Sequence, residues 1–378
     1  MAPAANKKFR VLIVDDSAFM RKVLEHIFNA DDQLQVAGHA KDGREAVTMA
    51  ESLKPDVITM DINMPHMDGL QATAQIMTTN PRPIVIVSSE SKDGAASTLK
   101  ALELGAIEFV GKPTSGIDLD MQSVREELLR KVRMAAKVRV VRTASRVALS
   151  VQGANGHAAA PPKASPVAPG RAASAIPADQ RFPIVVLGAS TGGPATVMRL
   201  APGFTRDFPA AVFLVQHMPA SFTTQYAAQL AEFTSIRVKE AESNEAVQPG
   251  TLYICPGGQH LRVTSAGRIQ LDAASGRING YLPNIDVTME TVAAFAGALS
   301  IGVVLTGMGN DGAQGAKAIR AASGMVLAQD EATSVIFGMP AEAIKLAAVD
   351  QVLALDDIYP AIEKRVISIC KATPVGVK

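Results

Sequence analysis

The feature that most constrains the fold of this chain is a repeated alternation between short apolar runs and stretches with helical spacing. In the first third of the sequence, each of the following runs precedes a helical stretch: 11–14, 34–37, 57–60, 84–87 and 107–110. Such alternation predicts a parallel sheet covered by helices on both faces. We therefore expect residues 8–136 to form a doubly wound α/β domain.

The alternation returns after a segment of different composition. Residues 137–181 are rich in Ala, Pro, Ser and Gly, with few large apolar side chains to offset the entropy of ordering, so we expect a flexible linker. Runs typical of buried strands resume beyond it, at 184–187, 211–215 and 301–306. Residues 182–370 are predicted to form a second doubly wound, Rossmann-like domain. Within it, 250–255 and 261–271 are expected to form a small β-hairpin.

Composition indicates an ordinary soluble protein. The 378 residues carry a formal net charge of +1, so no global field favours nucleic acid or an anionic membrane. Two cysteines argue against a disulfide framework and fit a reduced compartment. The apolar runs are shorter than the roughly 18 residues of a membrane span, and no signal-peptide pattern opens the chain. We expect a cytoplasmic protein without membrane insertion or nucleic-acid partners.

Polar side chains follow four of the predicted strands in the first domain. Asp15 and Asp16 follow the first strand, Asp61 ends the third, Ser88 ends the fourth and Lys112 lies past the fifth. The carboxyl ends of parallel strands share one edge of the sheet, and clustered carboxylates there suit Mg²⁺. One carboxylate is then a candidate nucleophile toward a phosphoryl donor. The structural alternative is that the first two aspartates cap a helix and the lysine is solvated.

Three motifs in this region resemble the response-regulator receiver family. They are Val-Leu-Ile-Val-Asp-Asp-Ser at 11–17, Met-Asp-Ile-Asn-Met-Pro-His-Met-Asp-Gly at 60–69, and Lys112-Pro113. The resemblance covers residues 8–136. It implies that Asp61 accepts a phosphoryl group from a histidine kinase.

The same resemblance implies roles for other residues of the domain. The implied Mg²⁺ site contains Asp15, Asp16, Asp61 and the backbone carbonyl of Asn63. The residues implied to contact the phosphate or to rearrange on phosphorylation are Ser88, Lys112 and Phe109.

A candidate nucleophile lies in the second domain. Gly-Ala-Ser-Thr-Gly at 188–192 follows a predicted strand and precedes Pro194, which is favoured in the first turn of a helix. The segment fits G-x-S-x-G, a sharp turn that exposes the hydroxyl of Ser190 beside a helix N-terminus. The alternatives are a phosphate-binding loop or a plain tight turn.

A serine nucleophile needs a base and a residue that orients the base. His217 directly follows the strand 211–215, whereas His260 falls in the predicted hairpin. Asp311 follows the strand 301–305, so it is expected at the same sheet edge as Ser190. The structural alternatives are a core histidine and a helix cap. The chain order Ser, His, Asp differs from that of α/β-hydrolases.

Two other output functions compete with hydrolysis. Gly-Met-Gly-Asn-Asp-Gly at 307–312 also fits the dinucleotide pattern G-x-G-x-x-G, and Asp330 stands where an acidic ribose ligand belongs. On pattern alone this reading and the triad are equally supported. A DNA-binding output is the third reading, but no basic recognition helix is evident after Gln180.

Motifs across the second domain resemble the CheB chemotaxis methylesterase family. They lie at 184–194, 215–218, 253–257 and 305–312. With the receiver and linker, the resemblance covers essentially the whole chain. It implies that Ser190 is the nucleophile, His217 the general base and Asp311 its orienter, with the backbone N–H of Met308 as an oxyanion donor.

The activity implied by this resemblance is hydrolysis of glutamate γ-methyl esters, and deamidation of particular glutamines, on the cytoplasmic helices of methyl-accepting chemotaxis receptors. No metal or organic cofactor is expected for that step. A receiver fused to an esterase suggests control: we expect the unphosphorylated receiver to cover the Ser190 edge and phosphorylated Asp61 to favour its release.

Overall fold

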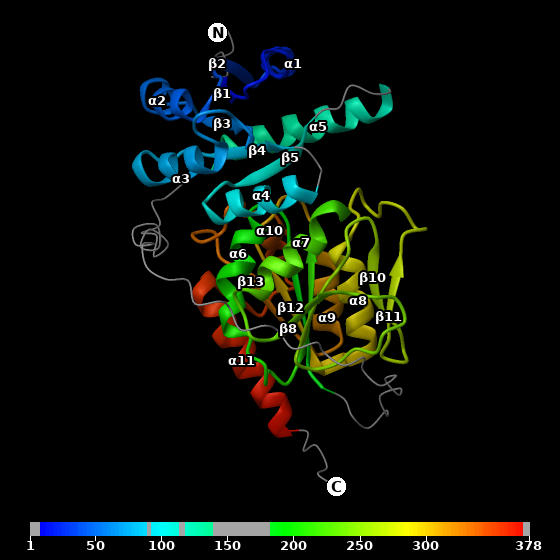
Figure 1. The fold of residues 1–378 in the computed structure, drawn as a ribbon. Coiled ribbons are helices and arrows are strands. Elements are labelled where there is room, and N and C mark those ends of the chain that lie inside the picture. Colours follow the sequence, from blue (N-terminus) through cyan, green and yellow to red (C-terminus); the bar gives the residue numbers. More distant parts are fainter. Residues whose placement is uncertain (1–7, 89–91, 113–117, 139–181, 373–378) are drawn as a thin grey trace, which may run out of the picture.

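The computed structural model describes residues 8–88, 92–112, 118–138 and 182–372 (Figure 1). Two parallel-sheet α/β units are present, which confirms the predicted fold class. Residues 139–181 of the predicted linker lie outside the described residues. The boundaries 8–136 and 182–370 remain predictions.

The N-terminal unit is a five-stranded parallel sheet in the order β2-β1-β3-β4-β5. Its elements alternate along the chain: β1 (Phe9–Val14), α1 (Ala18–Asn29), β2 (Leu34–Ala40), α2 (Gly43–Leu53), β3 (Val57–Met60), α3 (Gly69–Thr79), β4 (Ile84–Ser88), α4 (Lys92–Glu103), β5 (Glu108–Gly111) and α5 (Asp118–Ala135). The strand order reverses between β1 and β3, so a crevice is expected where these two strands end.

Continuous apolar runs form these strands because both faces of the sheet are covered. Val11 and Ile13 of β1 pack in a cluster with residues of α1 and α5. Leu12 and Val14 point to the other face, where residues of α2, α3 and α4 cover them. All four side chains are fully or almost fully buried.

The C-terminal unit is built on a seven-stranded parallel sheet in the order β14-β13-β12-β6-β7-β9-β8. Its elements are β6 (Ile184–Ala189), α6 (Gly193–Leu200), β7 (Ala211–Gln216), α7 (Ala220–Ala231), β8 (Arg237–Glu240), β9 (Thr251–Ile254), β10 (His260–Val263), β11 (Ile269–Asp272), α8 (Ile285–Ala296), β12 (Ser300–Val304), α9 (Ala313–Ala321), β13 (Met325–Gln329), α10 (Met339–Lys345), β14 (Gln351–Leu353) and α11 (Leu355–Ala372). Helices α6, α7 and α11 cover one face, and α8, α9 and α10 cover the other.

The predicted hairpin is only partly correct. The hairpin consists of β10 and β11, whose residues pair in antiparallel register. The expected first arm, 250–255, instead contains β9, which lies between β7 and β8 in the large sheet and pairs with both in parallel. An apolar run does not encode its pairing partner, because that partner is set by long-range packing.

The two units are packed together through α4 of the receiver-like unit, which lies over α6 and α7 of the second unit (Figure 1). The aromatic rings of Phe109 in β5 and Phe222 in α7 are 4.4 Å apart between centroids. Both side chains are buried in one apolar cluster that continues through both units. The carboxyl edge of the second sheet is therefore close to the first unit.

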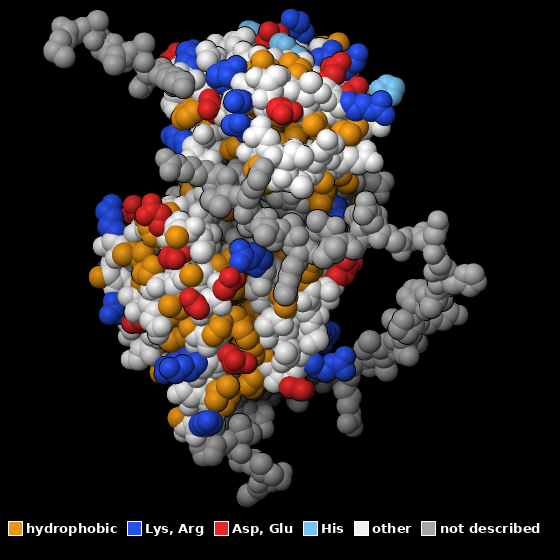
Figure 2. Space-filling model, turned by 90° about the vertical axis from the view of Figure 1, so that its left-hand side faces the viewer, with side chains coloured by type: hydrophobic (Ala, Val, Ile, Leu, Met, Phe, Trp, Pro, Cys, Tyr) orange, Lys and Arg blue, Asp and Glu red, His pale blue; other side chains and the backbone are white. Residues whose placement is uncertain are grey.

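The face drawn in Figure 2 carries positive and negative side chains interspersed among the described residues, with no broad field of one sign. This distribution agrees with the formal net charge of +1. Within the described ranges, none of the helices is long and apolar enough to span a membrane.

Candidate phosphorylation and hydrolase sites

Three carboxylates meet at the carboxyl edge of the first sheet. Oxygen atoms of Asp15, Asp16 and Asp61 lie within 4.8 Å of one another. The ammonium group of Lys112 is 2.9 Å from Asp15 Oδ2 and 2.8 Å from Asp61 Oδ2. The N-cap of α1 is Ser17, whose hydroxyl accepts from the N–H of Met20. The aspartates are therefore not the cap of that helix.

The electrostatics of this cluster favour a cation. Burial raises the pKa of Asp61, and the neighbouring Asp15 adds to the rise, while Lys112 opposes it. Burial by itself lowers the pKa of Lys112, but its ion pairs with Asp61 and Asp15 outweigh that effect and raise it. One lysine leaves net negative charge among three carboxylates, and all the donors are hard oxygens. The residues present therefore fit Mg²⁺.

The other predicted receiver residues are Asn63, Ser88 and Phe109. Asn63 is exposed in the loop that follows Asp61. Ser88 is buried at the end of β4. Phe109 is buried on the face of β5 that meets the second unit, and the ammonium of Lys131 lies 4.9 Å from its ring centroid. Phe109 therefore joins the first sheet to the interface with the second unit.

Ser190 stands in a sharp turn between β6 and α6. Its N–H donates to the carbonyl of Thr306 at 3.0 Å, which ties the turn to the end of β12. Gly192 caps α6 with a φ of +75°, a left-handed conformation that glycine adopts without strain. The backbone of Gly307 also passes close by, since a Cβ there would lie 2.7 Å from the Cβ of Ser190.

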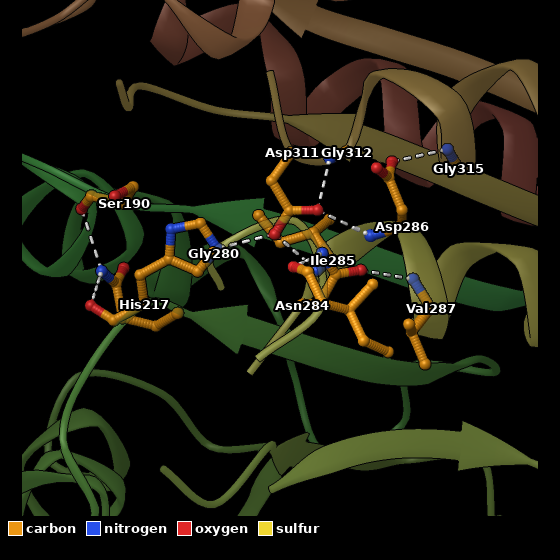
Figure 3. A network of polar contacts seen from close by, with 12 residues as sticks. Ser190, His217, Gly280, Asn284, Ile285, Asp286, Val287, Asp311, Gly312 and Gly315 are labelled. Carbon is orange, nitrogen blue, oxygen red and sulfur yellow. Dashed lines mark hydrogen bonds and ion pairs between the residues drawn. The ribbon is translucent and has the colours of Figure 1, made fainter. Parts of the chain in front are cut away.

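The predicted base and its predicted orienter are joined by a short hydrogen bond. His217 Nε2 is 2.7 Å from Asp311 Oδ2, and the imidazole lies between Ser190 and Asp311 (Figure 3). A carboxylate accepts, so Nε2 carries the proton and Nδ1 remains as the basic nitrogen. Among the described residues, no hydrogen bond joins Ser190 to the ring. Such bonds often tighten only when a substrate binds.

Asp311 is held at the N-terminus of α8 rather than as the cap of the helix that follows it. Its carboxylate accepts from the backbone N–H groups of Ile285 at 2.8 Å, Asp286 at 3.0 Å and Gly312 at 3.0 Å (Figure 3). Two of these donors are unpaired first-turn groups of α8, whose dipole favours an anion. The buried carboxylate is thus stabilised as a charge that orients His217.

A second buried acid lies beside this pair. Asp286 accepts from the N–H of Gly315 at 2.7 Å. Burial raises the pKa of Asp286 to about 6, the Gly315 hydrogen bond opposes the rise, and the charge of Asp311 adds to it. Asp311 thus accepts from the first turn of α8 and Asp286 from the first turn of α9, and only Asp311 bonds to the histidine.

Backbone groups that suit an oxyanion flank the serine. The N–H groups of Met308 and Thr191 donate to no other group within the described parts of the chain. Met308 follows Gly307, whose backbone lies against Ser190. Free N–H groups beside a nucleophile are the arrangement required to bind the charge of a tetrahedral intermediate.

Three residues near the serine escaped sequence reasoning. Gln216 donates from Nε2 to the carbonyl of Ser190 at 2.9 Å and so braces the turn. Tyr281 stacks on His217. Glu108 of β5 accepts from the hydroxyl of Thr191 at 2.8 Å, across the boundary between the units. Of these three residues, only Gln216 could have been found from the sequence, because it directly precedes His217.

The alternative dinucleotide site gains no support from the geometry. A Cβ on Gly309 would lie 1.9 Å from the hydroxyl of Tyr281, so that side chain fills the space above the glycine loop. Asp330 bonds instead to the backbone and hydroxyl of Thr333. His260 is fully buried and bonds to the carbonyl of Gly276, so it takes no part in the serine site.

Comparisons with known proteins agree with this architecture. The receiver domain of response regulators matches residues 11–123, and the CheB methylesterase family matches residues 185–362. The protein-glutamate methylesterase/protein-glutamine glutaminase of Pyrococcus horikoshii is 42% identical over 369 residues, covering 96% of this chain and 95% of that protein. That of Symbiobacterium thermophilum is 39% identical over 376 residues, covering 97% and 99%. The crystal structure of the Thermotoga maritima CheB methylesterase catalytic domain is 38% identical and covers 48% of this chain and 98% of that one, with a TM-score of 0.46.

The fold and the two strand-end sites define a response regulator with a hydrolase as its output domain. With relatives of about 40% identity along nearly its whole length, the chain belongs to the CheB family of protein-glutamate methylesterases/protein-glutamine glutaminases. It is an enzyme of that class, with a receiver domain of the kind that uses Mg²⁺ for phosphorylation.

The raised pKa of Asp286 generates a prediction about stability. Its pKa of about 6 exceeds the ordinary value of 3.8, so the folded state binds more protons than the unfolded state between these values. Stability is therefore lost as the pH rises through that window. We expect Asp286→Asn to raise the free energy of unfolding by on the order of 1 kcal/mol at pH 7 and to have little effect near pH 4. Urea unfolding at both pH values measures this, with exposed Glu331→Gln as control. An equal gain at both pH values would contradict the assignment.

Proposed function

We propose that this enzyme is a phosphorylation-activated serine hydrolase that removes γ-methyl groups from glutamates, and deamidates particular glutamines, on chemotaxis receptors. The observation that carries the proposal is the hydrogen-bonded pair of His217 and Asp311 at the strand edge that also holds Ser190. The contact of the receiver with the residue next to that serine supports control by phosphorylation.

The geometry supports a two-step acyl transfer. Ser190 Oγ attacks the side-chain carbonyl carbon of the substrate, and His217 Nδ1 takes the hydroxyl proton while Asp311 holds Nε2. The N–H groups of Met308 and Thr191 bind the oxyanion. The proton then passes to the leaving group, and methanol or ammonia departs. Water, deprotonated by the same nitrogen, then attacks the acyl-enzyme, the proton passes to Ser190 Oγ as the ester bond breaks, and a glutamate is released.

Phosphorylation is proposed at Asp61, with a chemotaxis histidine kinase as the donor. Mg²⁺ would be held by Asp16, Asp61 and the backbone carbonyl of Asn63, with Asp15 nearby, and it would offset charge on the transferred phosphoryl group. Lys112 and Ser88 would bind the phosphate oxygens. Receptor helices and kinase are cytoplasmic partners, so we propose the cytoplasm as the location.

Control is supported by a continuous set of contacts from the receiver to the serine turn. Glu108 Oε2 accepts from Thr191, and its Oε1 lies 3.4 Å from the ammonium of Lys131. Lys131 also donates to the carbonyl of Phe109 at 2.7 Å. The ring of Phe109 packs on Phe222. Because Phe109 lies on the strand that leads to Lys112, rearrangement at the phosphate would reach this interface.

The proposed function predicts methanol release from methyl-esterified receptor cytoplasmic fragments, stimulated by acetyl phosphate and Mg²⁺. Ser190→Ala should lower kcat by about 10⁶-fold, because loss of a triad nucleophile removes the covalent route. Asp61→Ala should retain basal release and lose the stimulation. Gas chromatography of methanol with all three proteins measures both effects.

Release that survives Ser190→Ala would exclude the serine mechanism. Stimulation that survives Asp61→Ala would instead place the phosphorylation site elsewhere and leave the serine mechanism intact.

The interface predicts a second effect, on basal activity. Glu108→Ala removes the acceptor for the Thr191 hydroxyl and should raise unphosphorylated turnover about tenfold, since a hydrogen bond to a charged acceptor contributes about 1.5 kcal/mol. Glu108→Gln retains an acceptor oxygen and should give a smaller increase. The measurement is initial methanol release without phosphodonor. Unchanged basal turnover in Glu108→Ala would show that this contact does not restrain the esterase.

A further inference from the structure

An aromatic ring lies against the catalytic imidazole. The rings of His217 and Tyr281 are stacked, with centroids 4.6 Å apart and an angle of 17° between their planes. The side chain of His217 is only 14% exposed. The imidazole is therefore held at two places, by Asp311 at Nε2 and by Tyr281 over one face.

Tyr281 is placed by a tight two-residue hairpin. Ile278 and Tyr281 exchange both backbone hydrogen bonds at 3.0 Å, and the residues between them, Asn279 and Gly280, have φ values of +53° and +87°. Asn-Gly is the favoured pair for such a turn. The side chain of Asn284, the N-cap of α8, donates to the carbonyl of Ile278 at 3.3 Å. The hairpin is thus fixed to the same helix end that binds Asp311.

The far end of the tyrosine is also fixed. Its hydroxyl lies over Gly309, where any side chain would collide with it. Burial raises the pKa of Tyr281, the charge of Asp311 adds to the rise, and the backbone N–H of Asn310 opposes it. The ring is thus neutral at physiological pH and spans from the histidine to the loop that presents Met308.

We propose that Tyr281 is a positioning residue for the hydrolase reaction, whose ring holds His217 in register with Ser190 and stabilises the imidazolium formed during turnover. This inference rests on the proposed serine mechanism. It assigns no proton transfer to the tyrosine hydroxyl.

The physical reason is a change of charge during the reaction. When His217 takes the proton of Ser190, the imidazole becomes a cation, and the face of a stacked aromatic ring attracts a cation. A neutral imidazole gains much less from the same ring, so the contact favours the charged state over the resting state. The ring also keeps water from one face of the base, so the imidazole keeps one orientation.

The test compares Tyr281→Leu, Tyr281→Phe and the full-length parent, all phosphorylated, in methanol release from methyl-esterified receptor fragments. We expect Tyr281→Leu to lower kcat about tenfold with little change in KM, because only the charged state loses stabilisation. Tyr281→Phe retains the ring and should restore most of kcat. Tyr359→Leu is the matched control, since that ring packs on Phe204 away from the site.

A second readout separates positioning from folding. Asp311 and Tyr281 are the titratable side chains in contact with the imidazole among the described residues, and Asp286 lies behind Asp311. Loss of the ring should move the acid limb of the kcat/KM profile to lower pH in Tyr281→Leu and not in Tyr281→Phe. A purely structural role would lower activity without moving that limb.

Three outcomes would overturn the inference: unchanged kcat in Tyr281→Leu, an equal loss in Tyr281→Phe, or an equal loss in Tyr359→Leu. The activity of Ser190→Ala is measured in the same assay, so that failure of this inference can be distinguished from failure of the proposed function. If Ser190→Ala is silent and Tyr281→Leu is fully active, the inference alone fails. If Ser190→Ala remains active, the proposed function itself fails.

Discussion

The packing of Phe109 against Phe222 is the contact on which the proposed coupling of the two domains depends. Phe109 lies on β5, which leads to Lys112 and its ion pair with Asp61. Phe222 lies in the first turn of α7, just after His217. Each ring is therefore a few residues from one of the two sites, and both are buried in one apolar cluster. A change at the proposed phosphate-accepting edge would have a short, packed route to the serine edge.

The proposed hydrolase site depends on the N-terminus of α8. Two first-turn N–H groups of that helix stabilise the carboxylate of Asp311, and the N-cap Asn284 fixes the hairpin that carries Tyr281. One helix end thus sets both groups that hold the imidazole. The receiver contacts the same site through Glu108 of β5, which accepts from the hydroxyl of Thr191 beside Ser190. The groups that orient His217 and the proposed contact for control by the receiver consequently lie in one region of the second domain.

Much of this arrangement was predictable because parallel strands buried on both faces give continuous apolar runs, and polar residues at their ends must share an edge. These positions predict that Ser190, His217 and Asp311 lie together. The prediction was wrong for β9, because its apolar run fits an arm of a hairpin as well as an inner strand of a parallel sheet. It also missed Tyr281, since stacking on a distant histidine depends on a turn conformation and a helix cap that no local pattern links to that histidine.

The central claim is that phosphorylation of Asp61 separates the receiver from the serine edge. Hydrogen–deuterium exchange of the full-length chain, with and without acetyl phosphate and Mg²⁺, tests it most directly. The account predicts faster exchange in α4 and α7, which pack on each other in this structure, and no change in Asp61→Asn. Stimulated methanol release with unchanged exchange in both helices would contradict it.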